Sequence, residues 1–252
     1  MLKVRAVGIC GSDLKYFGGH LQPGTDYPLL LGHEFTGEIV EVGPGVENYE
    51  PGMKVACAPD RPCGECEWCK KGEVNVCPNV EFAASEGVPG CLSEYYVADV
   101  SQLYPIPAKV DVVDAVLFEP LAIGLHMIEN VVKPNGGEDY AIVGCGTIGL
   151  LMLIAAQLNG ASRIFASDLT QERIDLAARL GADAVCNASK EDFLDLVMAE
   201  TNGRGADIVL EAGGTRESIW QAPSLACIHG TTVIEGIPHE EPVEFDVTAG
   251  RK

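Results

Sequence analysis

The order of apolar and polar positions divides the chain into two halves. Up to about residue 117, short β-like runs such as LKVRAVGI, TGEIVEVG, MKVACAP, SEYYVADV and QLYPIP alternate with glycine, proline and other turn residues. The turns recur roughly every 8–12 positions, which is the spacing of a small antiparallel β domain. Residues 1–117 are therefore predicted to form a β domain.

From residue 118 onward, strands alternate with helices. DYAIVG and RIFASD are apolar strands, and each precedes a helical run, TIGLLMLIAAQLNGA or TQERIDLAARLGA. Thr170 is a suitable N-cap for the second helix, and Gly181 is a suitable stop. DAVCN, ADIVLEAGG and GTTVIEGI supply further strands. This alternation predicts an α/β fold with a doubly wound parallel sheet over residues 118–252.

A glycine-rich turn joins the first of these strands to its helix. Gly144, Gly146 and Gly149 form G-x-G-x-x-G, and Asp168 closes the next strand. The glycines allow a tight turn, close approach to a pyrophosphate and close helix packing, with the helix N-terminus facing the anion. An acid at Asp168 suits a ribose hydroxyl and repels a 2′-phosphate, so NAD is favoured over NADP. An ordinary strand–turn–helix without a ligand is the alternative.

Composition limits the class of protein. The 252 residues carry a formal net charge of -20, which argues against binding nucleic acid. No 18-residue apolar run and no signal-peptide pattern is evident, so we expect no membrane span and a cytoplasmic protein. Ten cysteines in such a chain point to metal rather than disulfides.

Four of the cysteines are clustered in CGECEWCKKGEVNVCP, with the spacing C-x2-C-x2-C-x7-C. A bacterial iron–sulfur run has three residues before its final Cys-Pro, whereas this one has seven, although a ferredoxin-like electron carrier stays an alternative. A closed shell of four thiolates leaves no position for substrate, so the loop is predicted to hold a structural zinc. Its ligands would be Cys63, Cys66, Cys69 and Cys77. The remaining Cys57, Cys91, Cys145, Cys186 and Cys227 are interpreted as ordinary buried cysteines.

A different donor set occurs near the N-terminus. Cys10, His33 and Glu34 combine a thiolate, an imidazole and a carboxylate, the mixture that a catalytic zinc site uses while leaving a position open. Spacing alone does not assign them, because a lone cysteine and a lone histidine are usually structural.

Taken in order, GICGSD, GHEFTGEIVEVG, the four-cysteine run, EPLAIGLH and VGCGTIG resemble the zinc-dependent medium-chain alcohol dehydrogenases. NVCPNVEF, LYPIP and FEPLAIGLH are most similar to the sorbitol or polyol dehydrogenase branch. The resemblance covers essentially the whole chain. It implies a GroES-like β domain followed by a Rossmann domain, with a catalytic zinc held by cysteine and histidine as in alcohol dehydrogenase.

The resemblance also implies roles for particular residues. Cys10 and His33 match catalytic zinc ligands, and either Glu34 or Glu119 would complete the set; a helix N-terminal acid is the alternative for Glu119. Ser12 matches the hydroxyl that hydrogen-bonds the substrate, or else it caps a turn. Asp13 would orient His33 or form a turn. Tyr16 matches a tyrosine of the polyol pocket, or else it is a packed loop aromatic.

On the cofactor side, Ile148, Asp168 and Arg173 match contacts to NAD. Glu235, Gly236 and Ile237 fall where a loop approaches the nicotinamide, and an acid at position 235 departs from the expected aliphatic residue. Lys15 stands where many relatives place a relay histidine, so the proton path beyond Ser12 is open.

The activity implied is hydride transfer from a polyol or secondary alcohol to NAD, giving a ketone, with zinc polarising the hydroxyl. The alternatives are a threonine- or butanediol-type dehydrogenase, or a non-catalytic nucleotide- and zinc-binding remnant. Family members extend beyond both ends of this chain, so a truncated and incomplete pair of domains is expected. The family's dimers and tetramers imply a homo-oligomer, unless the missing C-terminal strand removes the interface.

Overall fold

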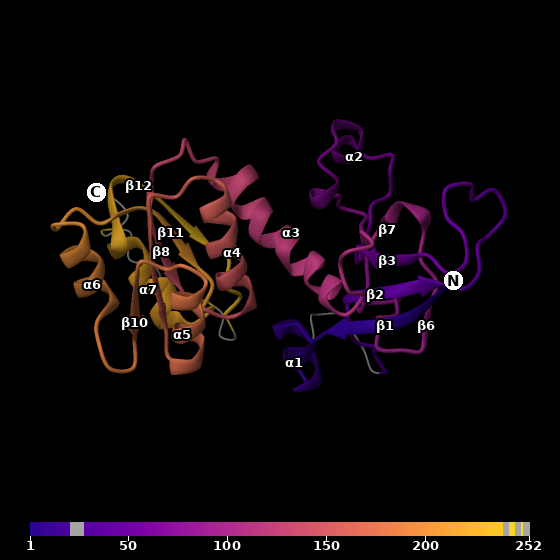
Figure 1. The fold of residues 1–252 in the computed structure, drawn as a ribbon, viewed down its shortest axis with the longest axis horizontal. Coiled ribbons are helices and arrows are strands. Elements are labelled where there is room, and N and C mark those ends of the chain that lie inside the picture. Colours follow the sequence, from indigo (N-terminus) through magenta and orange to yellow (C-terminus); the bar gives the residue numbers. More distant parts are fainter. Residues whose placement is uncertain (21–27, 239–241, 245–247, 249–252) are drawn as a thin grey trace. The chain divides into compact units, whose positions relative to one another are not determined.

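The computed structural model describes residues 1–20, 28–238, 242–244 and 248, and it divides into two compact units. The first unit is Met1–Glu119 and the second is Pro120–Lys252 (Figure 1).

The first unit is built on an antiparallel sheet, as the sequence predicts. Its strand order is β6-β1-β2-β3-β7, and every neighbouring pair runs antiparallel. The strands are β1 (Leu2–Gly8), β2 (Glu34–Ile39), β3 (Lys54–Cys57), β6 (Tyr95–Tyr96) and β7 (Leu103–Pro105). Alternate side chains of these strands pack into one core, in which Phe35 meets the edge of Tyr96 at a centroid distance of 4.8 Å.

Shorter elements surround this sheet and carry the candidate site residues. Helix α1 (Gly11–Phe17) follows β1, and the sequence analysis did not predict it. The remaining elements are β4 (Asp60–Arg61), α2 (Glu67–Lys71), η1 (Val74–Val76), β5 (Glu81–Phe82), η2 (Val100–Gln102) and η3 (Asp114–Leu117).

The second unit contains the predicted parallel sheet, with strand order β10-β9-β8-β11-β12. The strands are β8 (Asp139–Val143), β9 (Arg163–Asp168), β10 (Ala184–Asn187), β11 (Ala206–Glu211) and β12 (Ala226–Ile234). Counted from β8, the order is 3-2-1-4-5, which is the Rossmann arrangement, and the order reverses beside β8. A ligand site is therefore expected at the carboxyl end of β8.

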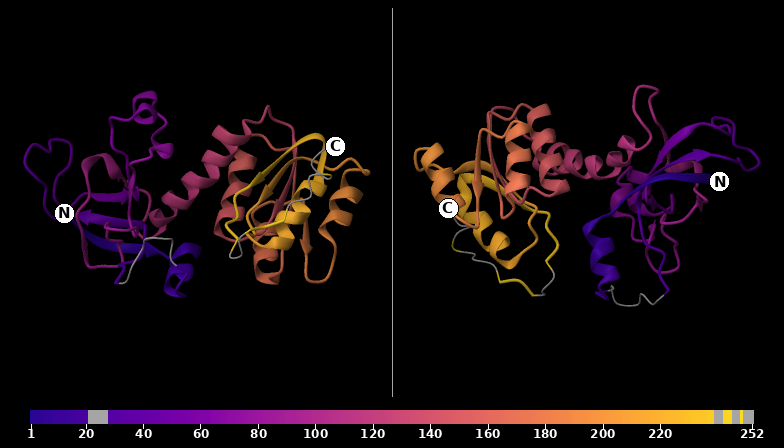
Figure 2. Two further views of the ribbon diagram at one scale, coloured as in Figure 1. Left: turned by 180° about the vertical axis from the view of Figure 1, so that it is seen from behind. Right: turned by 60° about the horizontal axis from the view of Figure 1, so that its bottom comes forward.

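Helices cover both faces of this parallel sheet (Figures 1 and 2). Tyr140 and Ile142 of β8 pack on one face, into a core that also contains Met152 of α4. Ala141 and Val143 pack on the other face, in a core shared with α6 and α7. Adjacent residues of a strand point to opposite faces, so a strand buried on both sides is apolar at every position. The helices are α4 (Thr147–Leu158), α5 (Gln171–Arg179), α6 (Phe193–Glu200) and α7 (Arg216–Leu225).

One helical run departs from the expectation that nothing in the chain could cross a membrane. Asp114–Val132, which comprises η3, α3 (Phe118–His126) and the π-helical η4 (Met127–Val132), has 19 residues and a mean hydropathy of 1.4. Its length and mean hydropathy would suffice for a membrane span, although it contains Asp114, Glu119 and Glu129. Length and composition alone are weak evidence, because core helices of other proteins pass the same test.

Candidate metal centres and nucleotide turn

The pairing of β1 with β2 brings the first candidate ligands together. In this antiparallel ladder Gly8 lies opposite Glu34, so Cys10, two residues farther along, comes beside His33 and Glu34. A Cβ on Gly8 would lie 2.2 Å from Oε2 of Glu34. The glycine therefore leaves the space that the Glu34 carboxylate occupies.

Cys10, His33 and Glu34 form one group of potential metal ligands. A sulfur of Cys10, an imidazole nitrogen of His33 and a carboxylate oxygen of Glu34 all lie within 4.8 Å of one another. His33 and Glu34 are buried and Cys10 is half-buried. Thiolate, imidazole and carboxylate are the donors that zinc prefers, so the residues present fit a zinc ion.

The electrostatics of this group also fit a cation. Burial raises the pKa of the Cys10 thiol, and hydrogen bonds from the side chain and backbone of Ser12 oppose part of that increase. Burial likewise raises the pKa of Glu34. Acidic donors gathered in a buried place favour protonation unless a positive charge is supplied, and a divalent cation supplies it.

Glu119 belongs to the same electrostatic environment. Burial, followed by the charge of Glu34, raises the pKa of its carboxyl to about 7. It stands in the first turn of α3, where an acid also interacts favourably with the helix dipole. Of the two candidate third ligands, Glu34 belongs to the group whose donor atoms lie within 4.8 Å of one another, and Glu119 is not a member of that group.

Asp13 links the two segments that carry these ligands. Its Oδ2 accepts a hydrogen bond from the backbone N–H of Cys10 at 2.9 Å, and its Oδ1 accepts one from Gly32 at 2.9 Å. Asp13 is buried and lies on α1. One carboxylate thus fixes the backbone next to both Cys10 and His33.

Two further predicted residues lie on α1. Ser12 is half-buried and hydrogen-bonds Cys10, so it lies beside the ligand group. Tyr16 is half-buried, one helical turn farther along.

Phe82 is a neighbour of the site that sequence reasoning missed. Its ring packs against His33 at a centroid distance of 5.4 Å with an interplanar angle of 50°. Phe82 lies on β5, far from His33 in sequence, and no local pattern signals the contact. Its position after the four-cysteine loop is the only available hint.

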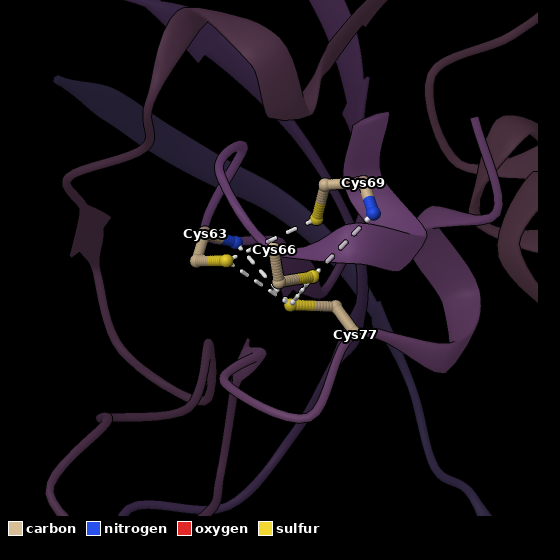
Figure 3. A group of neighbouring side chains, drawn as sticks. All are labelled: Cys63, Cys66, Cys69 and Cys77. Atoms are coloured by element: carbon tan, nitrogen blue, oxygen red, sulfur yellow. Dashed lines mark hydrogen bonds between the residues drawn. The ribbon is translucent and has the colours of Figure 1, made fainter. Parts of the chain in front are cut away.

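The four clustered cysteines converge on a single point (Figure 3). The sulfur of Cys77 lies 3.6 Å from that of Cys63 and 3.8 Å from that of Cys66, while the sulfurs of Cys63 and Cys69 are 4.0 Å apart. Four thiolates around one zinc at about 2.3 Å would be separated by about 3.8 Å. The observed spacings therefore fit a tetrahedral ion.

Local structure prepares this loop for a cation. Cys66 is the N-cap of α2, and its sulfur accepts a hydrogen bond from the N–H of Cys69. Backbone hydrogen bonds from Glu65 and Cys66 lower the pKa of the Cys63 thiol to about 6, which favours the thiolate. The other five cysteines are all buried, as the sequence analysis expected. All ten cysteines lie within the described residues, and none forms a disulfide.

The glycine-rich turn lies at the carboxyl end of β8. Gly144 has φ +95°, which an L side chain rarely adopts, and a Cβ on Gly149 would lie 1.8 Å from the carbonyl oxygen of Gly144. The backbone conformation at Gly144 and the close packing at Gly149 therefore require glycine at both positions, whether or not a ligand binds. Gly146 is different, because its φ is -70° and a Cβ there would meet no atom of the described residues within 4 Å. The space above Gly146 fits the approach of a pyrophosphate.

Asp168 ends β9 next to this turn. Its Oδ2 accepts a hydrogen bond from the N–H of Cys145 at 2.8 Å, and its Oδ1 accepts one from Thr170 at 2.8 Å. Arg173 places Nη1 at 3.6 Å from Oδ2. Ile148 is half-buried in the first turn of α4. Asp168 and its neighbour Arg173 thus lie beside the glycine turn, and Ile148 lies on the helix that follows that turn.

Glu235, Gly236 and Ile237 follow the end of β12. The backbone N–H groups of Glu235 and Gly236 donate to the carbonyl oxygen of Glu211 at 2.8 and 3.1 Å. Burial, followed by the charge of Glu211, raises the pKa of the Glu235 carboxyl. Ile237 is 70% exposed and is therefore accessible to a ligand.

Known proteins match this chain over nearly all of its length. Residues 1–108 match the alcohol dehydrogenase GroES-like domain, and residues 147–249 match the zinc-binding dehydrogenase family. Sorbitol dehydrogenase of Bacillus subtilis is 34% identical over 252 residues, covering 98% of this chain and 70% of the relative. The chain belongs to the zinc-dependent alcohol dehydrogenase family.

Solved structures of this family have the same fold. Galactitol-1-phosphate dehydrogenase of Escherichia coli superposes with a TM-score of 0.88 at 30% identity, covering 98% of this chain and 70% of that one. A zinc-binding dehydrogenase of Sinorhizobium meliloti, solved with NADP, gives 0.87 at 34% identity, covering 98% and 72%. The predicted GroES-like and Rossmann fold class is thereby confirmed.

Proposed function

We propose that this zinc-dependent oxidoreductase transfers a hydride from a secondary hydroxyl of a polyol to NAD, giving a ketone. The observation that carries the proposal is the convergence of Cys10, His33 and one carboxylate within 4.8 Å. Three protein donors leave a fourth position of a tetrahedral zinc free for a hydroxyl, which distinguishes a catalytic site from a closed structural one. When bound there, zinc would lower the pKa of that hydroxyl.

The surrounding side chains support this chemistry. Ser12 lies beside Cys10, where its hydroxyl can accept a hydrogen bond from a substrate hydroxyl in the open position. Asp13 holds the backbone next to Cys10 and His33, and Phe82 packs against the His33 ring. Lys15 follows on the same helix, in place of the relay histidine of many relatives.

Other residues are assigned supporting roles. Cys63, Cys66, Cys69 and Cys77 would hold a structural zinc, because a Cys₄ shell has no open position. Tyr16 is proposed to line the substrate pocket. In domain terms, residues 1–117 would bind the metals and residues 118–252 would bind the cofactor.

Polyols are the substrate class that the relatives favour. Two of the relatives named above act, by name, on sorbitol and on galactitol 1-phosphate, both of which are open-chain polyols. A polyol offers neighbouring hydroxyls that polar groups such as Tyr16 and Lys15 can hydrogen-bond.

NAD is proposed as the cofactor because of Asp168. Its carboxylate stands at the glycine turn and would hydrogen-bond a ribose hydroxyl while repelling a 2′-phosphate. One relative was solved with NADP, and the assay below therefore compares the two cofactors. Gly144, Gly146, Ile148, Gly149 and Arg173 would contact the pyrophosphate and adenosine, whereas Glu235, Gly236 and Ile237 would approach the nicotinamide.

The test is zinc-supplemented expression followed by measurement of NADH formation with sorbitol, xylitol, threonine, glycerol and butanediol, repeated with NADP. We expect turnover with a polyol and NAD that Cys10→Ser abolishes. The matched control is Cys227→Ser, which changes a buried cysteine of the second unit and should keep activity. Preferential turnover of threonine or butanediol would reassign the substrate class. NADH binding without turnover of any substrate would show a non-catalytic remnant.

A further inference from the structure

Glu211 is a fully buried acid that no role proposed so far requires. It is the last residue of β11, with 0% of its surface exposed. Its Oε1 accepts two hydrogen bonds, from the N–H groups of Gly213 at 2.9 Å and Gly214 at 2.8 Å. Its Oε2 is buried and has no hydrogen-bond partner among the described residues. A buried carboxyl oxygen without a hydrogen-bond partner lowers the stability of the fold, so a compensating role of this side chain is expected.

The turn that Glu211 holds packs against the glycine-rich turn after β8. A Cβ on Gly144 would lie 2.7 Å from the backbone nitrogen of Gly213 and 2.9 Å from the carbonyl carbon of Ala212. The N–H of Ala212 also donates to the carbonyl oxygen of Val143 at 2.8 Å. The position of the turn at 212–214 therefore determines where Gly144 can lie.

The same turn packs against the loop after β12 on its other side. A Cβ on Gly236 would lie 2.3 Å from the nitrogen of Gly214 and 2.7 Å from Oε2 of Glu211. A Cβ on Gly214 would lie 3.1 Å from both the nitrogen and the oxygen of Ile237. The two backbones therefore approach so closely that neither position has room for a Cβ, and a shift of the turn is expected to move the loop at 235–237.

We propose that Glu211 is a positioning residue of the nucleotide site: by clamping the turn at 213–214, it fixes the pyrophosphate-binding turn and the strand-end loop relative to each other. The inference rests on the proposed cofactor function of this unit. Both hydrogen bonds of this clamp are donated by backbone N–H groups. The clamp therefore requires an acceptor oxygen on a side chain long enough to reach Gly213 and Gly214. The two hydrogen bonds do not need a negative charge on Glu211, and such a charge helps to raise the pKa of the neighbouring Glu235 carboxyl.

Two conservative substitutions of Glu211 separate the effect of side-chain length from the effect of charge. Glu211→Gln keeps a carbonyl oxygen for Gly213 and Gly214 and replaces only the unpartnered Oε2, so it should preserve the clamp. Glu211→Asp keeps the carboxylate but shortens the side chain by one methylene, which moves both oxygens away from Gly213 and Gly214. Each lost hydrogen bond leaves a backbone N–H of the turn without its partner.

Glu138, just before β8, provides a matched control in the same unit. Its Oε1 accepts a hydrogen bond from Asn135 and its Oε2 is also buried without a partner among the described residues. It precedes β8, however, and therefore lies at the amino end of the parallel sheet, opposite the nucleotide turn. Glu138→Asp makes the same change at a place where it should leave cofactor affinity unchanged.

The experiment titrates the full chain and its three variants with NADH, and it measures backbone amide exchange without cofactor. We expect Glu211→Asp to weaken NADH binding about tenfold and to speed exchange at Gly213, Gly214 and Gly236. Glu211→Gln and Glu138→Asp should stay within about twofold of the parent in affinity and should keep exchange slow at these glycines.

Three results would overturn the clamp. If Glu211→Gln weakens NADH binding as much as Glu211→Asp does, the length of the side chain is not what determines the affinity. Unchanged affinity and exchange in Glu211→Asp would mean that nothing is clamped. Equal losses in Glu138→Asp would show a general effect of instability. If the parent chain does not bind NADH, the proposed function fails, and the amide exchange of the variants still decides whether Glu211 holds both segments.

Discussion

Asp13 Oδ1 lies 3.8 Å from Nδ1 of His33, and both side chains are buried. The same carboxylate accepts hydrogen bonds from the backbone of Cys10 and of Gly32. The carboxylate therefore holds the two backbone segments that carry the candidate ligands and lies near the imidazole. This relationship makes Asp13 a sensitive test of the metal site.

Asp13→Asn should weaken binding of the catalytic zinc by about 10–100-fold, because the amide removes one acceptor and the charge that lies near the imidazole. Zinc affinity measured by competition with a chelator checks this. Asp111→Asn is the control, since Asp111 is exposed and accepts a hydrogen bond from Val113 in the same unit. Unchanged zinc affinity in Asp13→Asn would contradict the proposed catalytic site.

Cys66→Ser should reduce the zinc content from two ions per chain to one and lower the melting temperature, because serine is a poor zinc ligand and the loop would lose its cross-link. Metal analysis of the purified protein measures the ratio. Cys186→Ser, at a buried cysteine outside the cluster, should keep two ions. Iron with acid-labile sulfide in the parent protein would instead support an electron carrier.

Gly146→Ala should leave the free energy of unfolding within about 1 kcal/mol of the parent, because the new methyl group has room. It should still weaken NADH binding at least about tenfold, since the methyl group would occupy the space of a pyrophosphate. Calorimetry and an NADH titration measure the two effects.

Gly149→Ala serves as the structural counterpart of Gly146→Ala. Its methyl group would overlap the carbonyl oxygen of Gly144, so the free energy of unfolding should fall by about 1–3 kcal/mol or more. Equal loss of stability in both variants would contradict the distinction between a glycine that the fold needs and one that the ligand needs.

Glu235→Gln should change how stability depends on pH. The folded protein raises the pKa of Glu235 above its ordinary value of 4.5, so folding favours the protonated form. The parent should therefore lose this contribution as pH rises from 4.5 through the raised pKa, and the glutamine variant should not. Denaturant unfolding at pH 4.5 and 7.5 measures the difference, and a variant that loses relative stability toward pH 7.5 would contradict it.

Much of the fold follows from local sequence patterns. The change from turn-rich runs to strand–helix alternation places the parallel sheet where β8–β12 lie, because strands covered on both faces must be apolar throughout. The four-cysteine spacing and the G-x-G-x-x-G motif are similarly local, since each can be recognised from one short stretch of sequence. Helix α1 was missed because seven residues containing glycine, serine and aspartate carry a turn-like composition.

Only the tertiary structure decided how distant segments meet. The register that places Gly8 opposite Glu34 brings Cys10 to His33, and the fold carries Phe82 onto the imidazole. The clamp of Glu211 on two turns that follow different strands is likewise invisible in a local window. A sequence pattern records which residues are neighbours along the chain and which face water. The packing of one backbone against another, which forces Gly144 and Gly236 to be glycine, depends on contacts that exist only after folding.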